Sequence, residues 1–271
     1  MIINIKNVQI GGGTTPKILG ILNISPESFY PDSYTPINQI LNKATKMISD
    51  GVDIIDIGAR STALNSPTIS ISEERDRLIH ALKELTELDN IVLSVDTIHP
   101  EVLNAALHYD INLINDINGL LDPEYTQIVA DSGLPVIAMA THRIPGDSTN
   151  LIETHRSIQE VVDRANKYDI NELIIDPGVG NWISNRSIEA DWELCRHFNE
   201  FHQYGFPILA AISRKKFIGD IIGKPSNKRM YGTLGLLFYI LEHGRVDMIR
   251  VHDISESKDI IQIFLKLYQN I

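Results

Sequence analysis

Residues 18–24, with the sequence ILGILNI, form an almost unbroken run of apolar side chains in which Asn23 is the one polar residue. Runs of the same kind recur along the chain at residues 52–57, 91–95, 111–117, 134–140, 172–175, 207–212 and 246–251. They are rich in Ile, Val and Leu on both faces, which is typical of strands buried on both sides of a parallel sheet. The sequence therefore predicts eight buried parallel strands.

Amphipathic stretches separate these runs and predict helices. Thr35 is a suitable N-cap, and Pro36 after it is suited to the first position of a helix. The expected helices cover residues 37–48, 72–85, 100–108, 122–132, 154–168, 186–203, 227–243 and 255–268. Strands that alternate with helices predict an α/β fold, a single (β/α)8 TIM barrel domain over residues 1–271. An open, doubly wound sheet is the alternative architecture.

Residues 1–17 precede the first run and have a different pattern. Apolar and polar side chains alternate as far as Ile10, and three glycines follow at 11–13. Alternation that ends in turn residues indicates a β-hairpin. We expect a short N-terminal hairpin that closes the bottom of the barrel.

Composition and charge exclude several classes of function. The 24 Lys and Arg residues against 35 Asp and Glu residues give a net charge of −11, which argues against a broad nucleic-acid interface. A local basic cluster in a cleft can still bind a small anion. Cys195 is the only cysteine, which rules out an internal disulfide and fits a reducing cytoplasm. Without a signal peptide or an apolar run of ~18 residues, we expect a cytoplasmic protein with no membrane partner.

Most of the apolar runs end in polar side chains. The carboxyl ends of barrel strands meet at one face, where catalytic residues lie. An Asp after a strand can instead be the N-cap of the next helix, but so many polar ends together indicate a ligand rich in donors and acceptors. The polar residues at these ends are Asn23, Asp56, Asp96, Asn115, Asp116, Thr141, His142, Asp176, Ser213, Arg214, Lys215, Arg250 and His252.

These side chains fall into two chemical groups. The acidic and amide members, with Asp96, Asn115 and Asp176 among them, suit a heterocycle that carries ring N–H and amino groups. The other members, Lys215, Arg250 and His252, supply donors for a phosphate or a ring carbonyl. Together they predict a small anionic substrate that carries a polar heterocycle.

Seven motifs between residues 18 and 254 resemble, in order, the signatures of the dihydropteroate synthase family. They are GILNISPESF (20–29), IIDIG (54–58) followed by Ser61 and Thr62, SVDT (94–97), INDI (114–117), DPGVG (176–180), SRK (213–215) and RVHD (250–253). The resemblance implies a (β/α)8 pterin-binding barrel. It also implies a reaction that joins 6-hydroxymethyl-7,8-dihydropterin pyrophosphate to p-aminobenzoate and releases pyrophosphate.

The resemblance further implies a role for each matching residue. The pterin would be held by Asp96, Asn115, Asp176 and Lys215, with Met139 beside the ring. The pyrophosphate would be held by Asn23, Arg250 and His252, with Asn23 near Mg²⁺, the expected cofactor. Ser61 and Thr62, preceded by Arg60, would form the loop for the second substrate. The expected catalytic residues are Asn23, Lys215, Arg250 and His252.

Several positions depart from the family pattern. The family has Glu before the Ser-Thr pair and Arg-Pro-Gly after it, whereas this chain has Arg60 before the pair and Ala63 after it. The aromatic residue that follows Asp-Pro-Gly-x-Gly is replaced by Asn181, with Trp182 one place later. These departures fall on the acceptor pocket, the part of the site expected to bind the aromatic amine that accepts the pterin group. A related aromatic amine is therefore an alternative to p-aminobenzoate as the second substrate.

Two other functions remain open at this point. A pterin-dependent methyltransferase that feeds a corrinoid would use a similar barrel, but the SRK motif and the loop at Asn23 favour the synthase. A pterin-binding protein without synthase activity is supported by the altered loop at Ala63. Members of such barrel families often form homodimers through outer helices, although no apolar stripe in this sequence identifies an interface.

Overall fold

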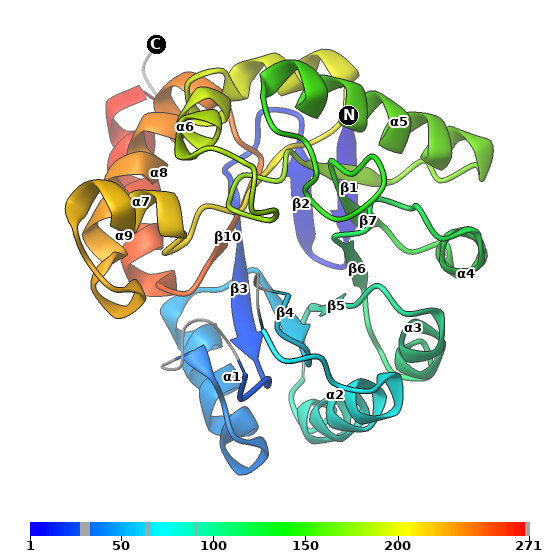
Figure 1. The fold of residues 1–271 in the computed structure, drawn as a ribbon. Coiled ribbons are helices and arrows are strands. Elements are labelled where there is room, and N and C mark those ends of the chain that lie inside the picture. Colours follow the sequence, from blue (N-terminus) through cyan, green and yellow to red (C-terminus); the bar gives the residue numbers. More distant parts are fainter. Residues whose placement is uncertain (28–32, 63–65, 90, 269–271) are drawn as a thin grey trace.

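A closed ring of parallel strands lies at the centre of the molecule, and helices surround it (Figure 1). The computed structural model describes residues 1–27, 33–62, 66–89 and 91–268. The strands of the ring are β3 (Lys17–Asn23), β4 (Ile54–Gly58), β5 (Leu93–Asp96), β6 (Leu113–Asp116), β7 (Val136–Met139), β8 (Leu173–Asp176), β9 (Leu209–Ala210) and β10 (Met248–Val251). The eight predicted strands are thereby confirmed.

The order of the strands distinguishes a barrel from an open sheet. The hydrogen-bonded order is β8-β7-β6-β5-β4-β3-β10-β9, so the first strand of the ring lies between the second and the last. A parallel bridge between Ile175 and Ile208 joins β8 to the segment that leads into β9. The predicted (β/α)8 barrel is confirmed, and the open doubly wound sheet is excluded.

Helices cover the outside of the ring, and several begin with a side-chain cap. They are α1 (Ile40–Asp50), α2 (Ile71–Leu85), α3 (Pro100–Ala106), α4 (Pro123–Ser132), α5 (Leu151–Lys167), α6 (Ile188–Arg196), α7 (Lys216–Ile222), α8 (Met230–Gly244) and α9 (Ile254–Tyr268). The side chains of Ser70, Asp122 and Asn150 accept N–H groups at the starts of α2, α4 and α5. Among the described residues, no helix is long and apolar enough to cross a membrane.

The helix boundaries correct the sequence prediction at three places. The helix expected from residue 37 begins as a 3-10 turn over Ile37–Gln39, and α1 starts at Ile40. The helix expected over residues 186–203 is divided into α6 and a 3-10 helix, Phe198–Tyr204. Helix α7, which follows the SRK motif, was not predicted, because a helix of 7 residues is too short to show a clear period.

The N-terminal hairpin closes the bottom of the barrel, as predicted. Its strands, β1 (Ile2–Ile5) and β2 (Val8–Gly11), pair antiparallel, with Ile3 opposite Ile10. Four hairpin side chains form one buried cluster with a residue from nearly every strand of the ring. The cluster consists of Ile3, Ile5, Val8, Ile10, Leu19, Ile54, Val92, Leu113, Ile137, Ile174, Leu209, Ala211 and Met248.

Because of the two-residue period of a strand, the same inner face continues from the bottom cluster to the mouth of the barrel. Side chains two positions apart on a strand lie on the same face. Leu19 belongs to the bottom cluster, and Asn23, four residues later, lines the cavity at the other end. Leu113 and Asn115 are related in the same way on β6. The inside of the barrel is therefore apolar at the hairpin end and polar at the carboxyl ends of the strands.

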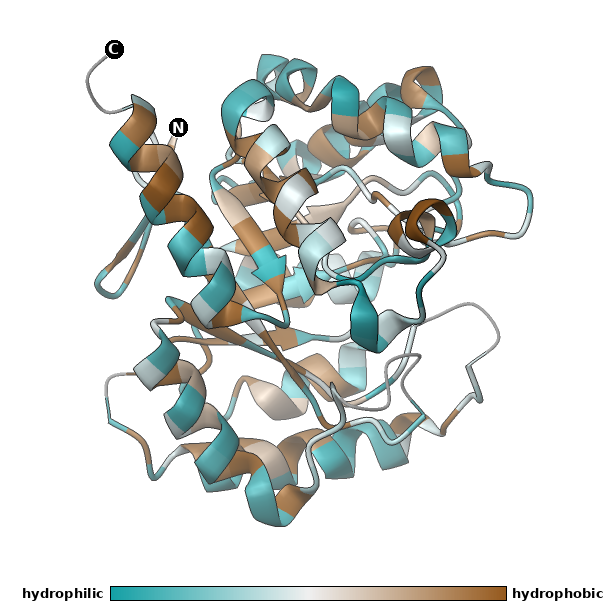
Figure 2. Ribbon diagram, turned by 90° about the vertical axis from the view of Figure 1, so that its left-hand side faces the viewer, coloured by the Kyte–Doolittle hydropathy of each residue, from teal (hydrophilic) through white to brown (hydrophobic). Residues whose placement is uncertain are grey.

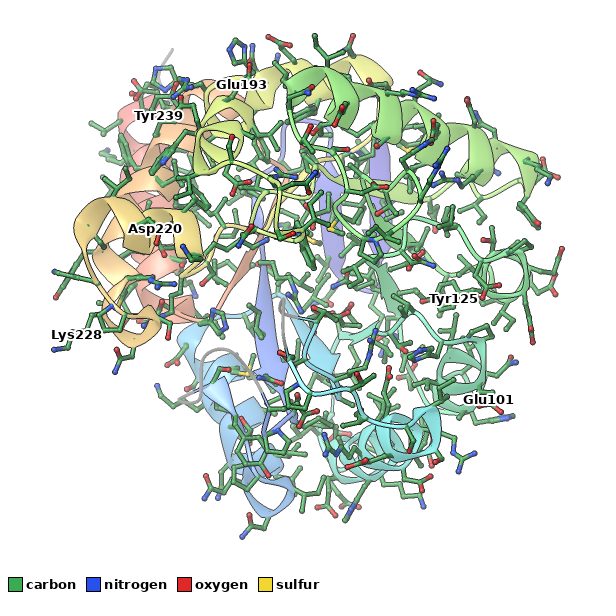
Figure 3. The ribbon with its side chains drawn as sticks, in the orientation of Figure 1. Glu101, Tyr125, Glu193, Asp220, Lys228 and Tyr239 are labelled. Carbon is green, nitrogen blue, oxygen red and sulfur yellow. The ribbon has the colours of Figure 1, made fainter. Side chains whose placement is uncertain are left out.

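The opposite faces of the strands pack against the helices in a second, larger core cluster. Figure 2 shows hydrophobic strands inside and hydrophilic faces on the surrounding helices. Charged side chains such as Glu101 on α3 and Asp220 on α7 lie at the rim of the molecule (Figure 3). This packing makes the ring a rigid frame for the residues at its mouth.

Candidate active site

A cavity of about 520 Å³ opens at the carboxyl ends of the strands. It collects the inward-facing residues that follow nearly every strand, together with residues of the loops and of the turn before α8. The lining residues are Ile21, Asn23, Gly58, Arg60, Ser61, Thr62, Asp96, Asn115, Ile117, Asp176, Gly180, Asn181, Trp182, Ala211, Ser213, Lys215, Lys216, Ser226, Arg229, Arg250 and His252.

The structure brings nearly all of the predicted site residues together in this cavity. Met139 is the exception, because it is fully buried at the end of β7, where it packs under Gly178. Among the other polar strand ends, Asp116 faces the helices and accepts the N–H groups of Asn118 and Leu120. His142 pairs with Glu160 on α5. Thr141, which donates to Ile117 O, and Arg214, which pairs with Asp253, also lie outside the cavity lining. Not all of the polar strand ends therefore join one site.

Arg250 links two carboxylates in the floor of the cavity. Its Nε donates to Asp56 Oδ2 and its Nη2 donates to Asp96 Oδ2, both at 2.7 Å. Asn115 Nδ2 donates to the same oxygen of Asp56 at 3.0 Å. Burial alone would lower the pKa of Arg250, but Asp56 and Asp96 raise it above its usual range. The guanidinium thus stays charged and fixes both carboxylates.

Asp96 keeps a marked tendency to take up a proton despite this partner. Burial raises its pKa to about 7, against the lowering effect of Arg250. A carboxyl group that can exist in both protonation states near neutral pH is suited to exchange hydrogen bonds with a heterocycle. Asp96 is therefore a functional-site candidate on geometry and on chemistry.

Lys215 and Asp176 form the opposite wall. Asp176 is 5% exposed and accepts the Gly178 N–H at 2.8 Å. Burial raises the pKa of Asp176, and Lys215 opposes that rise. Lys215 Nζ donates to Val179 O and lies 4.9 Å from the centroid of the Trp182 ring. Burial lowers the pKa of Lys215 to about 8, so the amine is largely charged at neutral pH.

His252 is held as a neutral ring. Its Nδ1 lies 2.9 Å from Ser213 Oγ, and its backbone N–H donates to the same hydroxyl at 3.1 Å. Burial lowers the pKa of His252 to about 3, and Arg250 adds to this effect. At neutral pH the imidazole therefore supplies hydrogen bonds but no charge.

Asn23 is fixed by the segments that follow β3. Its Oδ1 accepts the Ser25 N–H at 3.0 Å, and its Nδ2 donates to Ser33 Oγ at 3.0 Å. Among the described residues, no group of three or more His, Cys, Asp or Glu side chains could hold a metal ion.

Arg60, on the loop after β4, forms an ion pair with the outer helix α2. Its Nε lies 3.2 Å from Oε2 of Glu74, a side chain that is 1% exposed. The same carboxylate also accepts Thr97 Oγ1 at 2.6 Å and lies 2.8 Å from His99 Nδ1. Ser61 and Thr62 line the cavity beside it. Ala63, where the family has an arginine, lies outside the described residues.

The cavity also contains residues that the sequence did not predict as site residues. Arg229, Ser226 and Lys216 add donors on the side of α7 and α8. No local signal marks Arg229, because it follows a 3-10 turn far from any strand end. Asp56 was noted as a strand end but given no role, and its contact with Arg250 spans 194 residues of sequence.

Comparison with known proteins assigns this site to a family. The model of the pterin binding enzymes matches residues 19–252. The dihydropteroate synthase of Synechocystis is 32% identical over 263 residues, which cover 93% of this chain and 90% of the relative. The chain belongs to the dihydropteroate synthase family. The Escherichia coli member is 29% identical over 92% of this chain and 90% of its own length.

Solved structures of dihydropteroate synthases agree with this assignment. The Yersinia pestis enzyme, in a sulfonamide drug complex, has a TM-score of 0.90 at 28% identity and covers 99% of this chain and 100% of its own. The Xanthomonas albilineans enzyme with 4-aminobenzoic acid has a TM-score of 0.84 at 29% identity, over 96% and 95%. As a dihydropteroate synthase family member, the chain is a transferase of folate biosynthesis.

Proposed function

We propose that the chain joins 6-hydroxymethyl-7,8-dihydropterin pyrophosphate to p-aminobenzoate, or to a related aromatic amine, and releases pyrophosphate. The observation that carries the proposal is that one cavity has hydrogen-bond acceptors on one wall and charged donors on another. Asp96, Asn115 and Asp176 offer acceptors and an amide, while Lys215 and Arg250 offer charged donors. A ring with amino and N–H groups, joined to a pyrophosphate, matches both walls.

The pterin is positioned by groups that are themselves fixed. Asp176 accepts hydrogen bonds from the amino group and a ring N–H, and the bond from Gly178 orients its carboxylate. Lys215 donates to an acceptor on the ring from its place above Trp182. Asn115, whose amide is fixed by its hydrogen bond to Asp56, contacts the edge of the ring. Positioning of this kind supplies much of the rate in a reaction between two bound substrates.

The leaving group is bound by the donors at the end of β10. The bond between the pterin methylene carbon and the pyrophosphate oxygen breaks, and pyrophosphate leaves with the electron pair. The amine nitrogen then forms the new C–N bond and loses a proton to solvent. Arg250 and His252 stabilise the charge that develops on the oxygen. The step requires no covalent nucleophile.

Mg²⁺ is the proposed cofactor, and it would arrive with the pyrophosphate. Mg²⁺ prefers oxygen ligands and often takes few from the protein and several from substrate phosphates. Asn23 lines the cavity, and its side-chain oxygen, which also accepts the Ser25 N–H, suits this pattern as a single protein ligand. When bound, the ion would neutralise charge on the leaving group. Calorimetric titration of pyrophosphate with and without Mg²⁺, on the parent and on Asn23→Ala, tests this apart from turnover.

The second substrate is proposed to bind beside Ser61 and Thr62. Both residues line the cavity on the side of Arg60, and Asn181 and Trp182 face it from the loop after β8. The Xanthomonas albilineans relative was solved with 4-aminobenzoic acid. Because Ala63 replaces the arginine of the family, a weaker hold on the carboxylate of p-aminobenzoate is expected.

A pyrophosphate-release assay with the dihydropterin pyrophosphate and a panel of aromatic amines tests the function. Release that depends on an amine is expected. Pterin binding with no release would favour a binding protein, and methyl transfer from a methyl-tetrahydropterin to a corrinoid would favour a methyltransferase. We also propose that the protein is cytoplasmic, in line with the free thiol of Cys195. A homodimer that binds only small-molecule substrates is proposed from the family resemblance alone.

A further inference from the structure

The most deeply buried ion pair outside the cavity lies directly behind its lysine wall. Arg186 Nη2 lies 2.8 Å from Asp191 Oδ1, and the two side chains are 1% and 2% exposed. Arg186 precedes α6, and Asp191 is in the first turn of that helix. A buried pair of this kind contributes little net stability, because the loss of hydration offsets the attraction. Its contacts therefore need another explanation.

The pair binds two separate loops. Asp191 Oδ1 accepts the N–H of Gly180 at 2.8 Å, and Arg186 Nη1 donates to the carbonyl of Ser148 at 3.0 Å. Gly180 belongs to the loop after β8, and Ser148 belongs to the loop between β7 and α5. The ion pair therefore fixes both loops to the start of α6.

Both loops contact the groups that line the cavity. Gly180 has a φ of +130°, and a Cβ there would lie 2.8 Å from Lys215 Cδ, so the lysine stem rests on this backbone. On the other side, a Cβ on Gly146 would lie 2.2 Å from Trp182 Cγ, so the loop before α5 packs against the indole. Lys215 and Trp182 are thus held between two segments that the pair joins.

We propose that Arg186 and Asp191 act as positioning residues that hold Lys215 and Trp182 in the geometry for pterin binding. The proposal rests on the proposed function, since it concerns the pterin half of the same site. Neither side chain lines the cavity, so the pair acts through Gly180 and Ser148. No motif of the sequence analysis contains either residue.

The charge of Asp191 adds a second consequence. Burial lowers the pKa of Lys215, and the nearby carboxylates of Asp176 and Asp191 oppose that effect. The other ionisable groups that face Lys215 are Arg186, Cys195 and Arg250. Removal of the Asp191 charge should therefore lower the pKa of Lys215 below about 8. The lysine would then lose its proton, and its hold on the pterin, at a lower pH.

Asp191→Asn is the principal test, because asparagine can still accept the Gly180 N–H. We expect the KM for the pterin substrate to rise about tenfold, with the KM for the amine little changed. The alkaline limb of pterin binding should move to lower pH. Glu189→Gln is the matched control, because Glu189 is on the same helix in an exposed pair with Arg196, and it should change neither readout.

A double variant guards against simple unfolding. Arg186→Met with Asp191→Leu removes both charges together and is expected to fold, since apolar pairs often replace buried ion pairs without loss of stability. It should still bind the pterin more weakly than the parent. Arg186→Lys keeps the positive charge but not the planar set of donors. Its affinity for the pterin should lie between those of the parent and the double variant.

The outcomes separate this proposal from the proposed function. A parent enzyme that turns over, with variants whose pterin KM and alkaline limb are unchanged, would overturn the positioning role alone. Equal losses for both substrates would also overturn it, because they would indicate a general structural defect. A parent without amine-dependent turnover would instead contradict the proposed function, while pterin calorimetry on the same variants would still test the pair.

Discussion

Asp176 combines deep burial with a place on the cavity wall, which makes its charge a sensitive probe of pterin binding. Its carboxylate is oriented by the Gly178 N–H and faces Lys215. Asp176→Asn keeps the shape of the side chain but removes the charge. Loss of a charged hydrogen-bond partner costs about 1.5–3 kcal/mol, or roughly tenfold to 150-fold in affinity. Calorimetry with a pterin that lacks phosphate checks this, and unchanged affinity would remove Asp176 from the site.

His252 is expected to act on the leaving group and not on the ring. His252→Ala should weaken pyrophosphate binding and turnover while sparing a pterin without phosphate, because the imidazole lies beside Ser213 at the end of β10. Titration of the two ligands separately distinguishes these effects. An equal loss for both ligands would show that the division between a ring site and a pyrophosphate site is wrong.

The pKa of the same imidazole predicts that His252→Ala also changes the pH dependence of stability. The folded protein keeps His252 neutral down to about pH 3, whereas the unfolded chain takes up a proton below about 6.5. Protonation of His252 therefore favours unfolding as the pH falls from 6.5 towards 3. His252→Ala should lose less stability than the parent across this window, as measured by denaturant unfolding at several pH values.

At the scale of the element, the N-terminal hairpin contributes to the stability of the barrel but supplies no residue to the cavity. Ile3 is fully buried in the cluster at the bottom of the barrel, whereas Ile2 beside it is 50% exposed. Ile3→Ala should cost about 2–5 kcal/mol of unfolding free energy through lost burial and a cavity. Ile2→Ala should cost less than about 1 kcal/mol.

Denaturant unfolding of the two variants measures this difference, and pterin calorimetry serves as the control. Pterin affinity should stay unchanged in both folded variants, because the hairpin and the pterin site are at opposite ends of the barrel. Equal stabilities of the two variants would show that the hairpin does not stabilise the barrel.

The loop after β4 is the segment that we propose holds the second substrate. Arg60 forms an ion pair with Glu74, which also holds Thr97 and His99, so we expect that it does not take over the role of the missing arginine. Arg60→Ala is expected to change p-aminobenzoate turnover little. Ala63→Arg should lower the KM for p-aminobenzoate by up to about tenfold, as expected for one added charged contact.

One condensation assay on both variants decides this question. A large loss of p-aminobenzoate turnover in Arg60→Ala would show that Arg60 has taken over the role. Efficient use of p-aminobenzoate by the parent, unaffected by either change, would contradict a weakened acceptor pocket.

Local sequence patterns were sufficient for most elements of the fold and failed where an element is short. The apolar runs predicted every strand of the ring, since burial on both faces leaves a strong signal. β9, expected over residues 207–212, spans only Leu209–Ala210, which pair with β10. On its other side, Ile208 before the strand makes a single bridge to Ile175 of β8.

The candidate site shows the same limit at the scale of the whole molecule. Strand ends could be predicted to meet, because barrel geometry brings them together. Which side chains pair could not be predicted, since Arg250 reaches Asp96 across 154 residues and Asp56 across 194. The burial that shifts the pKa of Asp96 and Lys215 depends on this packing, so it is invisible in any local pattern.

The closure of the ring is uneven. Between β3 and β4, five residue pairs are in register, from Leu19 with Ile54 to Asn23 with Gly58. Between β8 and β9, one bridge joins Ile175 to Ile208, with the Ile175 N–H bonded to Pro207 O at 2.9 Å. This seam, the contact between β8 and the segment leading into β9, lies directly below Asp176 and Lys215. Pterin bound to both residues would therefore connect its two sides.

Hydrogen exchange should reveal the seam. In the free protein, the Ile175 amide should exchange faster than the Ile55 amide, which is bonded to Val92 O within a longer ladder, because fewer contacts oppose local opening. Opening of the seam separates Asp176 from Lys215, so a pterin at 100 times its Kd should slow Ile175 exchange about a hundredfold. Amides of the β1–β2 hairpin that exchange by local opening should not respond, because that opening leaves the pterin site intact. Ile175 exchange that is as slow as that of Ile55 without ligand, or that ignores the pterin, would show that the seam is not a weak point coupled to the site.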